Sequence, residues 1–156
     1  SREEQVMLKA TVIVLIVMLA YAGIYSLMSI FVPAVMMKGA LTATTGKNLD
    51  NARDDGYLKA LTGGQRNIGI YALTTTIAGF FVLFAGFRKG QKWAWWSFLV
   101  VGGIAWLWGL IYSLVIGDKV NSLLMAIGIV IFLVGLLIPV KEFFGKEAEK
   151  SEGAGQ

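Results

Sequence analysis

The sequence predicts an all-α polytopic membrane protein: an antiparallel, left-handed bundle of four transmembrane helices with one short amphipathic helix on its outer surface. Four apolar runs support this fold class, at residues 10–37, 67–87, 93–117 and 120–140, and none contains a residue that is charged at neutral pH. Each run is about long enough for a helix to cross roughly 30 Å of hydrocarbon at about 1.5 Å per residue. The runs and their connections use nearly all of the 156 residues, so we expect a single membrane domain.

The chain contains neither histidine nor cysteine, which excludes several classes of function. Disulfides, iron–sulfur clusters, thiol catalysis and the commonest haem ligand require one of these residues. Pumps, proton relays and coupled transporters normally place an ionisable side chain within a span. We therefore expect no enzyme activity, no cofactor and no metal site. Basic residues flanking the helices explain the net charge of +4, so nucleic-acid binding is not implied.

The first span is expected at about residues 11–33. Its apolar stretch is about twice the length of a signal-peptide core, so we interpret it as a retained helix. The connection that follows, residues 34–66, is the one sizeable loop. Within it, apolar residues at helical spacing predict an amphipathic helix at 48–62, which ends before Gly63 and Gly64. This helix either covers the outer end of the bundle, or closes a ligand entrance or meets a partner.

The remaining spans are expected at about residues 67–87, 93–116 and 120–140, followed by a disordered tail at 145–156. Only Asp118 and Lys119 separate the last two spans. So short a connection makes these two helices antiparallel neighbours.

A basic turn before the third span determines the predicted orientation. The turn carries three cations and no acid and lies on the same side as both termini, which predicts a multi-pass protein of the cell membrane with both termini in the cytoplasm. The tryptophans directly after the turn favour the lipid headgroup level. The predicted membrane-interface residues are Arg88, Lys89, Lys92, Trp93, Trp95 and Trp96.

Small residues at alternating spacings of three and four indicate the faces through which the helices pack. Such a period of about 3.5 residues predicts left-handed crossings near 20°. In the second span the pattern also includes Thr76 and Leu83, and in the third it includes Trp95 and Trp106. The predicted packing residues are Gly69, Ala72, Gly79, Gly86, Gly102 and Gly109.

Uncharged polar side chains gather in the outer half of the spans, whereas the inner half is almost purely apolar. Hydroxyls in a span often bond back to a carbonyl of their own helix, which is one explanation of this pattern. The other is a pocket that opens outward and holds a lipid, a quinone or another uncharged small molecule. Its candidate lining residues are Tyr25, Ser26, Thr76, Trp106 and Tyr112.

Two short motifs carry a resemblance to a known group of proteins. An Arg-Asn-Ile-Gly sequence at 66–69 begins the second span, and the sequence at 88–96 leads into the third. Together they resemble small prokaryotic four-helix membrane proteins that are loosely DoxX-like. The resemblance implies a compact four-helix bundle and, from some DoxX-like members, association with membrane oxidoreductases that use quinone. Because this chain has no cysteine or histidine, no catalytic role is carried over.

Two functional hypotheses follow. The first is a non-catalytic accessory or scaffold subunit, surrounded by membrane lipids, that packs against other integral membrane subunits of a larger complex. The second is a binding protein for a lipid or quinone-like hydrophobic small molecule in the outer half of the bundle. A channel would need a continuous polar lining, which the apolar inner half does not offer.

Overall fold

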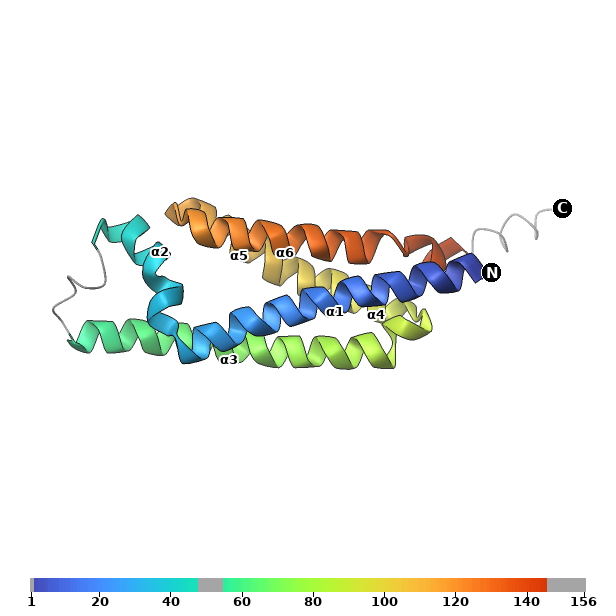
Figure 1. Ribbon diagram of the computed structural model, residues 1–156, viewed down its shortest axis with the longest axis horizontal. Coiled ribbons are helices and arrows are strands. Elements are labelled where there is room, and N and C mark those ends of the chain that lie inside the picture. The colour runs from blue at the N-terminus through green and yellow to red at the C-terminus, as the bar shows by residue number, and fades with distance from the viewer. Residues whose placement is uncertain (1, 48–54, 146–156) are drawn as a thin grey trace.

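The computed structural model describes residues 2–47 and 55–145, and every regular element in these ranges is helical (Figure 1). The long helices are α1 (Arg2–Phe31), α3 (Asp55–Ala85) and α6 (Lys119–Leu137), and α2 (Pro33–Thr45) is shorter. The third span is composite: α4 (Lys92–Ser97) continues through the π-helical segment η3 (Phe98–Gly102) into α5 (Gly103–Ile116). A 3-10 turn, η2 (Phe87–Lys89), precedes α4. The all-α fold class is confirmed.

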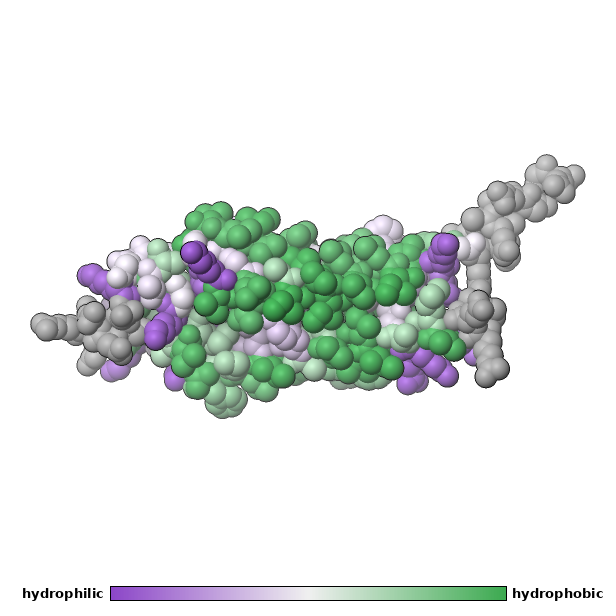
Figure 2. All heavy atoms as spheres, turned by 45° about the horizontal axis from the view of Figure 1, so that its top comes forward, coloured by the Kyte–Doolittle hydropathy of each residue, from purple (hydrophilic) through white to green (hydrophobic). Residues whose placement is uncertain are grey.

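Four helical stretches are long and apolar enough to cross a membrane, as the sequence predicts: Gln5–Phe31, Gly56–Lys89, Lys92–Ile116 and Lys119–Gly145. On the face that Figure 2 shows, hydrophobic residues cover most of the middle of the molecule, and hydrophilic residues lie toward both ends. The start of α1 and turn η2 lie at one end, here called the terminal end, and α2 lies at the opposite end, here called the α2 end (Figure 1). The part of the predicted tail at 146–156 lies outside the described residues.

The four spans alternate in direction, so the bundle is antiparallel (Figure 1). The long helices pack in series: α3 lies against α1, α1 against α6, and α6 against α5, whereas α3 and α5 are barely in contact. The connection at Gly117 and Asp118 is as short as expected, with Gly117 at a φ of 76° and Asp118 accepting a hydrogen bond from the backbone N–H of Asn121. The bundle is therefore open along the side between α3 and α5.

The loop between the first two spans differs from the prediction. Pro33 ends α1, because its ring disfavours helical backbone at Val32, and the chain continues at once as α2, which no sequence signal predicted. Helix α3 runs without a break through Gly63 and Gly64, so the expected helix end there is wrong. Neither glycine has a positive φ, and a glycine pair costs a long helix only about 1 kcal/mol per residue. Residues 48–54 of the predicted amphipathic helix lie outside the described residues.

The terminal end is closed by a cluster of aromatic rings. Phe87 is fully buried between Phe98, at 5.5 Å between ring centroids, and Phe143, at 4.8 Å. Trp95 donates its indole N–H to the carbonyl oxygen of Leu136 at 2.9 Å, which satisfies one of the acceptors left at the end of α6. These contacts tie the start of the third span to the end of the fourth.

Candidate ligand-binding cleft

A cavity of about 630 Å³ occupies the open side of the bundle between α3 and the composite third span. We call it the lateral cleft. Its floor is formed by α1 and α6, through residues such as Leu19 and Met125. Several residues of its lining, among them Ile68, Val101 and Trp108, are more than half exposed on the outer surface of the bundle. The cleft therefore opens sideways, toward the lipid phase.

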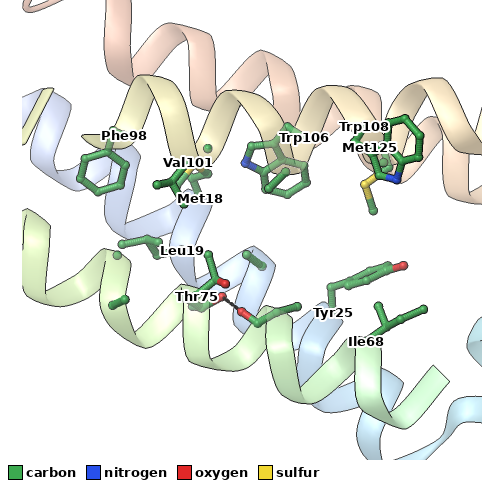
Figure 3. A pocket seen from close by; sticks show the side chains of 18 of the residues that line it. Met18, Leu19, Tyr25, Ile68, Thr75, Phe98, Val101, Trp106, Trp108 and Met125 are labelled. Atoms are coloured by element: carbon green, nitrogen blue, oxygen red, sulfur yellow. Dashed lines mark hydrogen bonds between the residues drawn. The ribbon is translucent and has the colours of Figure 1, made fainter. Parts of the chain in front are cut away.

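The half of the cleft nearer the terminal end is apolar. Val82 of α3 and Phe98 and Val101 of the third span line it, and Leu19 of α1 reaches it from the floor. Figure 3 shows Phe98 and Val101 on one wall, facing Leu19. Ser97, which also lines this half, donates its hydroxyl to the carbonyl oxygen of Trp93 at 2.8 Å. This part of the cleft is suited to hydrocarbon.

Trp106 forms the central wall of the cleft. Its ring stacks on Tyr21 at 6.1 Å between centroids and lies against Gly128, where a Cβ atom would collide with the indole. Gly109, which has no side chain, leaves room for the sulfur of Met125. Among the described residues none accepts a hydrogen bond from the Trp106 indole N–H. The ring is thus held by packing alone, with its donor unused.

The half nearer the α2 end is polar. The Tyr25 hydroxyl donates to Oδ1 of Asn121 at 3.3 Å, which joins α1 to α6. Gln65 of α3 donates through Nε2 to the hydroxyl oxygen of Ser29 at 3.1 Å. Tyr112 completes this end from α5. Four helices thus each contribute one uncharged polar side chain to the same end of the cleft.

Hydroxyls in the middle of the cleft are satisfied within their own helix. Thr76 donates to the carbonyl oxygen of Ala72 at 2.8 Å, and Thr75 donates to that of Tyr71 at 2.9 Å. None of the residues that line the cleft is charged. The titratable side chains of the lining are the phenols of Tyr25 and Tyr112, so the arrangement suits the binding of an uncharged molecule.

Four of the five predicted pocket residues line the cleft: Tyr25, Thr76, Trp106 and Tyr112. Ser26 does not, because it is fully buried against α3 and donates its hydroxyl to the carbonyl oxygen of Ala22 at 2.7 Å. Sequence reasoning missed Gln65, which it assigned to a loop, and it placed Asn121 among the outer polar side chains without including it in the candidate pocket. The continuity of α3 through Gly63 and Gly64 is what places Gln65 in the cleft.

The glycines assigned to packing lie where neighbouring side chains leave no room for a Cβ atom. A Cβ atom at Gly79 would lie 2.6 Å from the Leu19 side chain. One at Gly69 would lie 2.8 Å from the carbonyl oxygen of Ser26, and one at Gly102 would lie 2.5 Å from the Phe132 ring. The site of a Gly109 Cβ lies 2.8 Å from the Met125 sulfur, and at Gly86 the obstacle is Trp93. Ala72 lines the cleft and is half-buried. The hand of the helix crossings stays a prediction.

The predicted interface residues separate into two groups. Arg88 and Lys89 are exposed in η2, Trp93 and Trp96 are half-exposed, and the Lys92 ammonium lies 5.5 Å from the ring centroid of Phe144. Trp95 differs: it is 8% exposed and belongs to the buried aromatic cluster. Its indole faces the end of α6, following the same inward pattern as Trp106, and its assignment to the membrane interface stays a prediction.

No family model, curated protein or solved structure matches this chain. The DoxX-like resemblance therefore stays a prediction, and function has to be argued from the cleft itself.

Proposed function

We propose that this protein binds an uncharged hydrophobic small molecule, of the lipid or quinone kind, in the lateral cleft. The observation that carries this proposal is the cleft between α3 and α5, which is large, free of charged lining and open to the lipid side. Its volume of about 630 Å³ lies within the range of about 300–1,000 Å³ common for small-molecule sites.

The chemistry of the lining explains why the ligand should be uncharged. A charged group loses its hydration on burial and needs a counter-charge, which the lining residues do not supply. Apolar chains lose nothing by moving from lipid into an apolar cleft, and they gain close contact with Phe98, Leu19 and the flat ring of Trp106. A ligand would enter sideways from the membrane, without crossing water.

Such a protein would store or present its ligand rather than transform it, in keeping with the sequence-based expectation of no enzyme activity. We further propose that the terminal end faces the cytoplasm, because the cations of η2 lie at that end beside the start of α1.

The test is to purify the protein in mild detergent and identify what co-purifies by mass spectrometry of the extracted lipids. Trp106→Ala removes the central wall and Thr76→Leu fills the middle of the cleft, so both should reduce ligand occupancy. Trp96→Ala is the matched control, because Trp96 is half-exposed and lies outside the cleft. Equal occupancy in all three variants would contradict the proposal.

A second candidate function is the accessory subunit, and one observation favours it. Seven glycine and alanine residues line the cleft, and small side chains allow a partner's transmembrane helix to approach closely: Ala22, Ala72, Ala78, Gly79, Gly102, Ala105 and Gly109. Extraction from native membranes, followed by native gels and mass spectrometry, distinguishes the two. Stoichiometric co-migration with a larger complex supports the subunit, and migration alone with a bound lipid supports the binding protein.

A further inference from the structure

We infer that the lateral cleft selects an amphiphile with an uncharged, hydroxyl-bearing head group, held at the α2 end, and a single chain that extends toward Phe98. This inference rests on the proposed function and specifies the ligand class and its orientation. It comes from the distribution of unused hydrogen-bonding atoms along the cleft.

At the α2 end, three atoms from three helices have no hydrogen bond to any described residue. They are the amide oxygen of Gln65, the amide nitrogen of Asn121 and the hydroxyl of Tyr112. The Gln65 oxygen can accept a hydrogen bond, the Asn121 nitrogen can donate one, and the Tyr112 hydroxyl can do both. A hydroxyl is the smallest head group that can donate and accept at the same time, whereas a ketone only accepts.

The same side chains are held in place by their other atoms. Asn121 accepts from Tyr25 through Oδ1, and its backbone N–H donates to Asp118 Oδ1 at 3.1 Å. Gln65 is fixed by its bond to Ser29. Groups that are already oriented lose little freedom when a ligand binds, which strengthens each hydrogen bond that forms.

Toward the terminal end the polar atoms are already used. The hydroxyls of Thr75, Thr76 and Ser97 all donate to carbonyls of their own helix. The exception is the indole N–H of Trp106, six residues before Tyr112 and thus roughly 9 Å along α5. This N–H would donate to a second ligand oxygen that lies between the head group and the chain, such as an ester carbonyl. A monoacylglycerol has both features.

Charge at the α2 end argues against an anionic head group. Asp118, which is 3% exposed, lies directly behind Asn121, and its carboxylate would repel a fatty-acid carboxylate or a phosphate. Arg66 and Lys119 are exposed and do not line the cleft. An anion would therefore be buried without a cation beside it.

The test compares three probes that share a chain and a fluorescence quencher but differ in the head group: 1-(9,10-dibromostearoyl)glycerol, 9,10-dibromostearic acid and 9,10-dibromooctadecane. Bromine quenches tryptophan on contact, so saturable quenching of the full-length protein in detergent reports occupancy of the cleft. Trp106→Phe removes the signal of the central wall and leaves the other four tryptophans, of which Trp108 also lines the cleft and should still be quenched by a bound probe. We expect the glycerol ester to reach half-saturation at the lowest concentration and the acid at the highest.

Variants identify the head-group site. Tyr112→Phe removes a hydroxyl that bonds no described residue, so it should leave folding unchanged while raising half-saturation for the glycerol ester about fivefold. Asn121→Leu should raise half-saturation for the glycerol ester by as much or more, although it also removes the acceptor of the Tyr25 hydroxyl, and neither variant should affect binding of the dibromoalkane. Thr75→Val is the matched control, because that hydroxyl lines the cleft but is used within α3.

The outcomes separate the two proposals. If no probe quenches saturably, binding in the cleft fails altogether. If the ester and the alkane bind equally and Tyr112→Phe changes neither, the cleft binds ligands but the head-group inference is overturned. Tightest binding of the acid would also overturn it, because it would show recognition of a charge.

Discussion

The indole ring of Trp106 occupies the space in which a side chain at Gly128 would lie, so α5 and α6 meet through one large residue and one absent side chain. The same ring separates the polar and apolar halves of the lateral cleft. Packing between two helices and the shape of the cleft therefore depend on a single pair of residues.

This pair gives the first prediction. Gly128→Val should push the Trp106 ring from its place, lower the stability by about 1–3 kcal/mol and reduce cleft occupancy. Thermal unfolding in detergent measures the first effect and probe quenching the second. Adding Trp106→Leu should recover part of the lost stability, because the smaller side chain makes room. Additive losses in the double variant would contradict the pairing.

Gly79 and Leu19 should behave in the same way at the α1–α3 contact. Gly79→Leu places new atoms where Leu19 already lies, 2.6 Å from the Cβ position, so the melting temperature should fall. Gly103→Leu is the matched control, because nothing lies within 4 Å of a Cβ there. Equal melting curves for the two variants would show that the contact face of α3 has been wrongly assigned.

The hydrogen bond from Trp95 to Leu136 should be measurable by itself. Trp95→Phe removes the indole N–H while keeping an aromatic ring. It should lower the free energy of unfolding by about 1 kcal/mol or somewhat more, because a buried carbonyl at the end of α6 loses its hydrogen-bond donor. Trp96→Phe provides the comparison at a half-exposed position. Chemical denaturation followed by circular dichroism would measure both.

Orientation in the membrane can be tested with two single cysteines in a chain that has none of its own. Lys47 lies just after α2 and Lys89 lies in η2, at opposite ends of the bundle, and both are exposed. A thiol reagent that does not cross membranes should label Lys47→Cys in intact cells, and Lys89→Cys only after the cells are opened. The reverse pattern would place the termini outside.

The inward faces of the helices were predictable because they depend on local spacing. Leu15, Leu19, Ala22 and Ser26 follow one another at intervals of four, three and four residues, and in the structure Ala22 is half-buried and the other three are buried. A helix places such residues on one face whatever its neighbours are, so periodicity alone identifies the contact surface. The candidate pocket residues came from a different pattern, the gathering of uncharged polar side chains in the outer half of the spans, and four of the five line the cleft.

The sequence by itself determined the four spans, their antiparallel order and their contact faces, since span length, apolar composition and short connections act locally. Only the tertiary structure decided that α3 and α5 remain apart, which creates the lateral cleft. It also decided that α3 continues through Gly63 and Gly64, bringing Gln65 beside Tyr25 and Asn121, and that Trp95 turns inward to Leu136. Each of these depends on contacts between residues far apart in the chain, which no local pattern encodes.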